Sequence, residues 1–298
     1  MPISTLIPGS YGSSTGYPPC PLCAGLVSIG SSCGNCHAPA DVIESIMSRD
    51  VAGRFIGVLG PSGVGKTVYL GMLLDLLSKG WKDLRGLPRG PFSMSLQRNV
   101  MLSLERQRFP EKTPTEPDRW QWVHCEVATG KKGRSFDVIT PDVAGEAVMG
   151  ELESPGSNPT IRALIGRCSG LVVLADIVQV IADGQGQELF ATQLISYLAS
   201  LRPSRRNRKV TVPTAIVFTK TDLCDEPTTD PDTFARDNTP GLWRYCEARL
   251  ERFRFFRSRV AGSTAILVDR SGRESLIPLR VEPDGVVEPF AWLTTQMK

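Results

Sequence analysis

Long apolar runs, a secretory leader and a strong net charge are all missing from this chain of 298 residues. The longest apolar stretches, such as residues 171–175, have the length of a core strand and cannot span a membrane. Residues 1–19 have no basic segment followed by an apolar one, and their Ser, Gly and Pro content predicts a flexible tail. The net charge of +3 gives no reason to expect nucleic acid or a membrane surface as a partner. Eight cysteines without a leader predict reduced thiols and a cytoplasmic protein.

The composition is that of a globular protein with many turns. Apolar residues make up 41% of the chain, enough for a sizeable core, beside 28 glycines and 23 prolines. Predicted strands alternate with predicted helices, so we expect an α/β fold with a mainly parallel sheet. The expected strands are 54–60, 120–129, 134–140, 170–176, 214–220 and one that begins at 255, with a hairpin turn at 131–133. The expected helices are 68–80, 93–109, 187–201, 241–253 and 288–297, and a further hairpin is expected at 265–281.

Residues 60–67 read GPSGVGKT and fit the pattern G-x-x-x-x-G-K-[ST] without deviation. The glycines let the backbone wrap so that N–H groups point at phosphate oxygens, and the following helix presents its positive dipole end. We expect Lys66 to reach the β- and γ-phosphates and the Thr67 hydroxyl to bind Mg²⁺. A strand precedes the loop and a helix follows it, which a chance Gly-rich turn would not require. The nucleotide-binding residues predicted here are Gly60, Ser62, Gly63, Val64, Gly65, Lys66, Thr67 and Val68.

Two further motifs, DVAGE and TKTD, lie at the ends of expected strands. Asp142 can hold a water of Mg²⁺, and Gly145 can offer its N–H to the γ-phosphate. Asp222 can accept both N1–H and N2–H of guanine, whereas adenine would leave it unpaired, and the Lys220 stem can lie over the base. The alternative is that TKTD begins a helix, with Thr221 or Asp222 as its N-cap. The order of the three motifs, each at a strand end, favours GTP over ATP.

Together, these motifs resemble the first, third and fourth motifs of the translation-factor-related GTPases, which include the small signalling GTPases. The resemblance covers about residues 54–262, and TKTD departs from the usual N-K-x-D by placing Thr219 for Asn. The fifth motif, usually Ser-Ala, should fall within SRVAG, and we place it on Arg259 and Val260. With four cysteines near the N-terminus, the chain more narrowly resembles the bacterial double-GTPase families of conflict and defence-type systems. That resemblance implies a switch that acts on a protein encoded nearby.

The resemblance also implies a first switch and a residue for hydrolysis. The switch needs a Thr that reaches Mg²⁺ when the γ-phosphate is present. Thr113 and Thr115 lie in a Pro-rich segment just before the strand expected at residue 120, where such a switch should fall. We prefer Thr113, with an ordinary loop threonine as the alternative. Glu146 stands where small GTPases have a Gln that orients the attacking water, and we take it with Lys66 as a candidate catalytic residue. An ionised Glu only accepts hydrogen bonds, so hydrolysis is slow without help, or Glu146 has a raised pKa, or it is structural.

Four cysteines follow the pattern C-x₂-C-x₉-C-x₂-C, which is typical of tetrahedral Zn²⁺ coordination; they are Cys20, Cys23, Cys33 and Cys36. Four protein ligands leave no open position, so the predicted metal is structural, and the alternative is free or disulfide-bonded cysteines. No Lys or Arg lies between Cys20 and Cys36, which favours protein docking over nucleic-acid contact. The basic segments 202–209 and 247–259 could meet an anionic partner, but a solvated loop and an amphipathic edge are the preferred interpretation.

These predictions combine into one domain plan and one leading function. The plan has a tail at 1–19, a zinc ribbon at 20–37, a linker at 38–53 and a GTPase domain at 54–298, which includes an inserted region at 82–119 and a C-terminal hairpin and helix at 263–298. The leading function is a cytoplasmic switch that binds Mg²⁺ and GTP or GDP and hydrolyses GTP slowly until a protein partner or self-association stimulates it. The alternatives are a P-loop ATPase and a non-hydrolysing interaction module that nucleotide stabilises.

Overall fold

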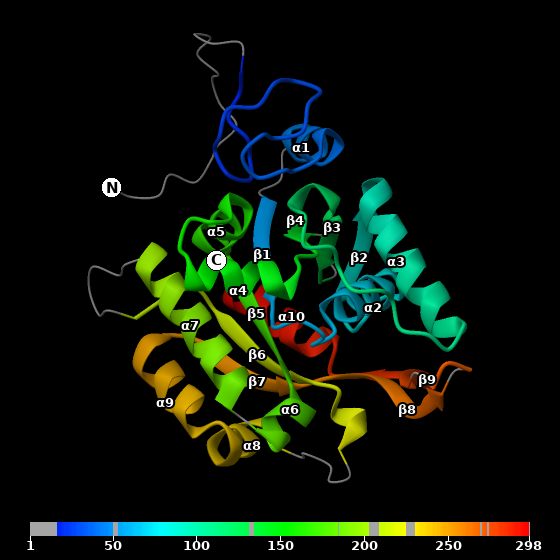
Figure 1. The fold of residues 1–298 in the computed structure, drawn as a ribbon. Coiled ribbons are helices and arrows are strands. Elements are labelled where there is room, and N and C mark those ends of the chain that lie inside the picture. The colour runs from blue at the N-terminus through cyan, green and yellow to red at the C-terminus, as the bar shows by residue number, and fades with distance from the viewer. Residues whose placement is uncertain are drawn as a thin grey trace.

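The computed structural model describes residues 17–49, 53–130, 134–183, 185–202, 209–224, 230–268, 270–272 and 274–297. Its centre is a seven-stranded sheet in the order β2-β3-β4-β1-β5-β6-β7 (Figure 1). The five strands from β4 to β7 in this order are parallel; at the other edge β3 is antiparallel to β4, and β2 is antiparallel to β3. The predicted mainly parallel α/β fold is therefore confirmed. The strands are β1 Gly53–Leu59, β2 Leu84–Arg89, β3 Trp122–Thr129, β4 Arg134–Pro141, β5 Gly170–Asp176, β6 Thr214–Thr219 and β7 Phe253–Arg257.

Strand position in the sheet follows from residue type. Every residue of β5 is buried, as its continuous apolar run predicts for a central parallel strand. The strands β3 and β4 pair as the predicted antiparallel hairpin, and its expected turn at 131–133 lies outside the described residues. Strand β2, in the inserted region, was not predicted because Gly86 and Pro88 interrupt its apolar pattern. It is an edge strand, which is where a sheet tolerates proline.

Helices cover both faces of the sheet and enclose two apolar cores (Figure 1). One face carries α2 Lys66–Lys79, α3 Gly90–Glu105 and α10 Val287–Gln296. The other face carries α4 Gly145–Glu153, α5 Pro159–Arg167, α7 Gln185–Leu201 and α9 Pro240–Arg249. Short connecting elements are η1 Pro117–Arg119, α6 Ile177–Ala182, η2 Thr221–Leu223 and α8 Pro231–Asn238. Among the described residues, no helix has both the length and the apolar character needed to cross a membrane.

In the C-terminal part of the chain, the structure differs from one sequence prediction. Residues 241–253 were expected as one helix, but α9 ends at Arg249 and Phe253 already belongs to β7. The reason is packing, because Phe255 stacks between Phe218 and Trp243 once β7 pairs with β6. After β7 the chain forms an antiparallel two-stranded sheet of its own, β8 Arg259–Val268 and β9 Glu274–Asp284. This hairpin contains and exceeds the predicted one at 265–281.

The four-cysteine segment packs on the same end of the sheet as α1 Ala40–Met47 (Figure 1). A third apolar cluster joins the cysteines to Val42 and Ile43 of α1 and to Trp122 and Ile139 of β3 and β4. An ion pair between the Arg49 guanidinium and Asp137, with a distance of 2.6 Å, adds a polar contact. The segment 38–53, expected as a linker, thus contributes a packed helix, and its residues 50–52 lie outside the described part of the chain.

Candidate functional site

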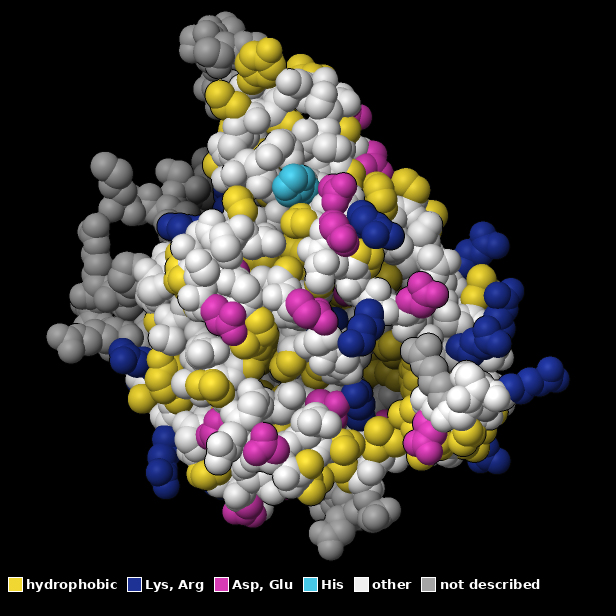
Figure 2. Space-filling view, in the orientation of Figure 1, with side chains coloured by type: hydrophobic (Ala, Val, Ile, Leu, Met, Phe, Trp, Pro, Cys, Tyr) yellow, Lys and Arg dark blue, Asp and Glu magenta, His cyan; other side chains and the backbone are white. Residues whose placement is uncertain are grey.

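A cavity of about 260 Å³ opens at the carboxyl ends of β1 and β6. Its lining comes from the loop after β1 with the first turn of α2, residues 109–113, the start of α4, the end of β6 with η2, residues 258–261 and Leu276 of β9. Figure 2 shows the hollow in the face turned to the viewer, with Lys and Arg side chains in and beside it. The carboxyl edge of a parallel sheet is where α/β proteins bind ligands.

The loop at 60–67 needs its glycines for two different reasons. Gly63 and Gly65 have φ values of +74° and +96°, which residues with a Cβ adopt only under strain. Gly60 instead lies so close to β5 that a Cβ would be 2.8 Å from the Leu174 carbonyl oxygen. Helix α2 begins at Lys66, so its first backbone N–H groups have no partner within the helix and face the cavity.

Lys66 is held over this loop by the backbone. Its Nζ donates to the carbonyl oxygens of Gly60 and Pro61 at 3.0 and 2.8 Å. Burial lowers the pKa of Lys66 to about 8, while the nearby carboxylates of Asp142 and Glu146 act in the opposite direction. An anion in the cavity would favour the charged form of this amine.

The three residues predicted to bind Mg²⁺ lie together at one end of the cavity. The hydroxyls of Thr67 and Thr113 lie 2.9 Å apart, and both donate to Asp142 Oδ2, at 2.9 and 3.1 Å. The other oxygen, Asp142 Oδ1, is buried and has no hydrogen-bond partner among the described residues. Burial raises the pKa of Asp142, against the effect of these hydrogen bonds and of Lys66. A buried carboxylate with two hydroxyls is a donor set that fits a hard divalent cation.

The start of α4 touches the phosphate loop directly. A Cβ on Gly145 would collide with the Ser62 backbone nitrogen, so this approach admits only glycine. The Ser62 hydroxyl donates to Glu146 Oε1 at 2.5 Å. This hydrogen bond lowers the pKa of Glu146, and the charges of Lys112 and Lys66 act in the same direction. This direction speaks against a raised pKa for Glu146, whose carboxylate accepts the Ser62 hydrogen bond.

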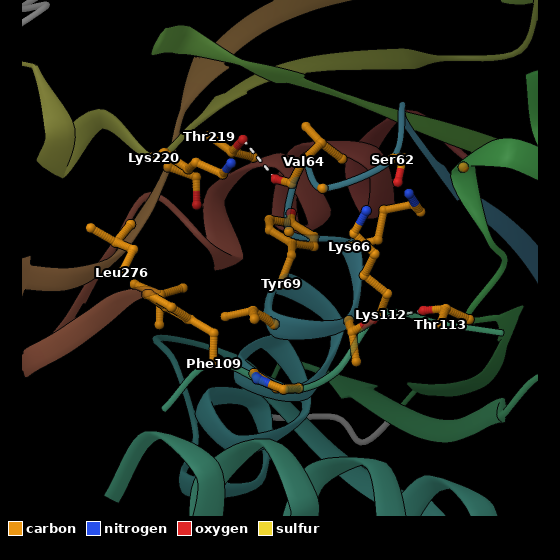
Figure 3. A pocket seen from close by; sticks show the side chains of 18 of the residues that line it. Ser62, Val64, Lys66, Tyr69, Phe109, Lys112, Thr113, Thr219, Lys220 and Leu276 are labelled. Carbon is orange, nitrogen blue, oxygen red and sulfur yellow. Dashed lines mark hydrogen bonds between the residues drawn. The ribbon is translucent and has the colours of Figure 1, made fainter. Parts of the chain in front are cut away.

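The opposite end of the cavity is built by the TKTD segment. The Thr219 hydroxyl donates to the Val64 carbonyl at 2.9 Å and so ties the end of β6 to the phosphate loop (Figure 3). Thr219, which stands in place of the usual asparagine, thus makes a direct hydrogen bond between the two motifs. Lys220 has a φ of +60°, and its Nζ donates to Asp176 at 2.6 Å. A positive φ is uncommon for lysine and marks a conformation that its surroundings enforce.

Asp222 lines the cavity, and burial raises the pKa of its carboxyl group, opposed by Arg259 and Lys220. The TKTD segment does begin a short helical turn, but neither Thr221 nor Asp222 is its N-cap. The short turn η2 has Lys220 in the N-cap position without a side-chain capping bond, and the Thr221 hydroxyl donates to the Ser258 carbonyl instead. Arg259 and Val260, predicted from the SRVAG segment, also line the cavity. The Arg259 Nε is buried and has no hydrogen-bond partner among the described residues.

Several lining residues were not predicted from the sequence, among them Phe109, Lys112 and Leu276 (Figure 3). Lys112 precedes the predicted Thr113, and a cation beside a Mg²⁺ and phosphate site could have been found by charge alone. Phe109 and Leu276 offered no such signal, because an apolar residue in a loop or a hairpin looks the same in sequence wherever it points.

The four predicted zinc ligands also converge. Their Sγ atoms lie within 4.8 Å of one another, with Cys20–Cys36 at 3.8 Å and Cys23–Cys33 at 3.6 Å. Zn–S bonds of 2.3 Å in a tetrahedron separate sulfurs by about 3.8 Å, so the spacing fits Zn²⁺. No disulfide joins cysteines of the described residues. Hydrogen bonds to Cys20 and Cys23, with burial, raise the pKa of the Cys36 thiol. A bound cation would stabilise the thiolate form of these cysteines.

Among the described residues of the two basic segments, none before residue 258 lines the cavity. Residues 203–208 lie outside the described part of the chain. In the second segment, Phe255 is a core residue, and the Arg252 guanidinium donates to the carbonyl oxygens of Thr211 and Gln296. These contacts favour the structural interpretation of this segment over an anionic partner.

A phosphate loop, a buried Asp at the end of β4 and a carboxylate after β6, arranged on a parallel sheet, define a P-loop nucleotide-binding protein. More narrowly, the chain belongs to the Double-GTPase 2 family, whose model matches residues 54–276. This match includes both ends of the cavity and begins after the four cysteines. Guanine-nucleotide binding follows from the family.

Comparison with solved structures found a similar chain in the signal recognition particle receptor SRb-GTP/SRX complex from Chaetomium thermophilum. It is 18% identical, with a TM-score of 0.35, and the match covers 70% of this chain and 91% of that one. No curated protein matches the chain.

Proposed function

We propose that the protein is a GTP-dependent switch that needs Mg²⁺, hydrolyses GTP slowly on its own and acts on a protein partner. One observation carries the proposal. Two threonines and a buried aspartate, contributed by three segments, meet at one end of the cavity, while a second carboxylate, Asp222, lines the other end. The first group fits a cation with phosphates, and the second fits the donor edge of guanine.

At the phosphate end, the chain's own groups would hold the triphosphate in place. The N–H groups of the loop and of the first turn of α2 would donate to phosphate oxygens, and Lys66 would leave its backbone carbonyls to pair with the β- and γ-phosphates. Thr67 and Thr113 would ligate Mg²⁺, and the unpartnered Asp142 Oδ1 would accept from one of its waters. The cation supplies positive charge that neutralises the phosphates.

At the base end, Asp222 would accept from both N1–H and N2–H of guanine. Adenine offers an acceptor at N1 and nothing at C2, so it would leave a partly buried carboxylate unpaired. The aliphatic part of Lys220 would lie against the base plane, with its ammonium group kept in place by Asp176. Arg259 brings a buried and unpartnered Nε to the same end. These contacts support guanine over adenine.

The switch would consist of residues 109–115 and α4. Thr113 reaches the cation site from a loop, and Gly145 presents the first N–H of α4 beside the phosphate loop. A γ-phosphate and its Mg²⁺ would engage both segments, and GDP would engage neither fully. The conformation of both segments would then depend on the third phosphate.

Slow hydrolysis follows from the state of Glu146. Its carboxylate accepts from Ser62, and this hydrogen bond holds its pKa below the ordinary value, so an ionised Glu146 would accept hydrogen bonds but would not donate them. A group that orients water beside a triphosphate works best when it both accepts and donates. We infer that a partner or a second copy supplies the hydrogen-bond donor that Glu146 lacks.

We propose that the partner is a protein encoded nearby. The four-cysteine ribbon lacks Lys and Arg between its cysteines and offers a surface for protein docking.

Calorimetric titration of the zinc-loaded protein in Mg²⁺ tests the proposal, with GDP, a non-hydrolysable GTP analogue and the matching ATP analogue as ligands. We expect guanine nucleotides to bind and the ATP analogue to give no signal. Equal binding of both bases would leave a P-loop ATPase as the explanation. Rapid GTP turnover by the purified protein alone would contradict partner-stimulated hydrolysis. Identical partner affinity in the GDP and GTP states would reduce the nucleotide to a stabiliser of the fold.

A further inference from the structure

The β8–β9 hairpin is fastened to both halves of the nucleotide site at its root. The Tyr69 hydroxyl of α2 donates to the Val286 carbonyl at the end of the hairpin, at 2.9 Å. The backbone N–H of Ser258, just before β8, donates to the carbonyl oxygen of Phe218 in β6 at 2.8 Å. Gly285 has a φ of +68° and packs so tightly on the Arg257 carbonyl that a Cβ would not fit. The position of the hairpin is therefore set by the phosphate-loop helix and by the strand that leads to Asp222.

From this root the hairpin reaches over the cavity. The pairing of β8 with β9 is irregular between Arg259 and Thr264, which is how a hairpin bends and twists. Leu276 of β9 lies beyond the bend and lines the cavity, while its own side chain stays 39% exposed. Ile266 is directly opposite Leu276 in the β8–β9 register and is 65% exposed. The two side chains share one face of the hairpin, because directly paired residues do.

Leu276 lies at the base end rather than the phosphate end. Figure 3 shows it on the side of Lys220, away from Ser62 and Thr113. Besides the charged residues Lys220, Asp222 and Arg259, the lining also contains apolar side chains such as Leu223 and Val260, and Leu276 adds to this apolar surface. The part of a nucleotide that matches an apolar side chain is the face of the purine and the carbon edge of the ribose, whereas the phosphates do not.

We propose that Leu276 is a nucleotide-contacting residue that packs on the base and ribose, and that bound nucleotide holds the hairpin over the cavity. The proposal rests on guanine-nucleotide binding at this site and adds a contact from outside the phosphate, cation and base-reading motifs. Nucleotide binding would then affect a hairpin on which other apolar side chains, among them Ile266 and Leu267, are exposed to solvent. The contact is independent of the number of phosphates, because Leu276 lies at the other end of the ligand.

The test compares Leu276→Ala with Leu279→Ala in the full-length, zinc-loaded chain. Leu279 is a matched control on the same strand, with 45% exposure and no place in the cavity lining. We expect Leu276→Ala to weaken binding about five- to tenfold, the effect of uncovering part of an aliphatic side chain. The loss should be the same factor for GDP and for a non-hydrolysable GTP analogue and should appear as faster dissociation. Leu279→Ala should stay within about twofold of wild type, as for most exposed substitutions.

Hydrogen exchange of the wild type gives a second readout that needs no variant. Addition of GDP should slow exchange of the amides in β8 and β9 beyond the bend. Equal affinities of the two variants, or unchanged exchange in the hairpin of the GDP-bound wild type, would overturn the role of Leu276 alone. A loss for the GTP analogue but not for GDP would place the contact at the phosphates and would overturn it as well. Failure of the wild type to bind guanine nucleotides would overturn this inference together with the proposed function.

Discussion

The four-cysteine cluster and the nucleotide cavity are two sites of this chain that are built in opposite ways. The cluster takes all four sulfur ligands from residues 20–36. The cavity takes its lining from segments between Ser62 and Leu276, which only the fold of the sheet brings together. The ribbon packs through one small apolar cluster, whereas the cavity stands on a sheet between two large cores.

This difference predicts how each site fails. A site of local ligands in a small segment depends on its metal, because too little apolar surface is buried to hold it otherwise. A site at the edge of a large sheet is held by the sheet. The loss of a single side chain there leaves the fold intact but weakens ligand binding. Mutations should therefore separate folding of the ribbon from chemistry at the cavity.

The largest effect is expected for Cys33→Ser, which removes one thiolate from the proposed Zn²⁺ site, because a structural Zn²⁺ of this kind contributes on the order of 10 kcal/mol. Metal analysis should find zinc lost from the variant, and hydrogen exchange should find the segment 17–47 unprotected. GDP affinity should change by no more than about threefold, because distant sites are nearly independent. Cys224→Ser, a thiol outside the cluster, is the control and should keep its zinc. Loss of nucleotide binding together with zinc would show that the two regions are not separate.

Asp222→Asn should have the next largest effect, and only at the cavity. An amide accepts less well from N1–H and N2–H, so GDP affinity should fall about a hundredfold or more. Affinity for xanthosine diphosphate, which has a carbonyl at C2, should rise. Calorimetry measures both, with the exposed Asp237→Asn as the matched control. An unchanged base preference would contradict the assignment of Asp222.

Thr113→Ala tests the cation end and should act on one nucleotide state. If Thr113 binds Mg²⁺ only when the γ-phosphate is present, affinity for a GTP analogue should fall about tenfold while GDP binding is kept. Thr115→Ala is the control, because Thr115 lies two residues away and does not line the cavity. Equal losses in the two variants, or equal losses for the two nucleotides, would remove Thr113 from the switch.

The smallest effect is expected for Glu146→Gln. A neutral amide can accept and donate, so basal hydrolysis measured in single turnover should rise several-fold, to about the range that one repositioned polar group provides. Glu153→Gln, on the exposed side of the same helix, should leave the rate unchanged. A tenfold fall in Glu146→Gln would instead mean that the carboxylate itself works in hydrolysis, as a general base.

The sequence predicted local features better than those that depend on tertiary contacts. The cysteine cluster and the loop at 60–67 could be found because their spacing lies within a few residues. Asp142 and Asp222 could be found because each follows an apolar strand, and parallel strands end at the same edge. Thr113 was chosen over Thr115 without a physical reason from the sequence, and only the fold separates them, by placing Thr113 on Asp142.

Other features could not be predicted because nothing local encodes them. Strand β2 contains Gly86 and Pro88, and its place at the sheet edge makes both acceptable. Helix α9 stops at Arg249 because Phe253 and Phe255 pack better in a strand beside β6. Leu276 reaches the cavity through the bend of a hairpin, a property of backbone pairing rather than of residue type.

We propose that a third phosphate changes the conformation of two segments, and hydrogen exchange of the zinc-loaded protein can show whether it does. The exchange of residues 109–115 and of α4 should be compared with GDP and with a non-hydrolysable GTP analogue, both in saturating Mg²⁺. We expect the GTP analogue to protect both segments well beyond the protection given by GDP, with the remaining sheet unchanged. Equal protection by the two nucleotides would contradict the switch, even if guanine nucleotides bind tightly.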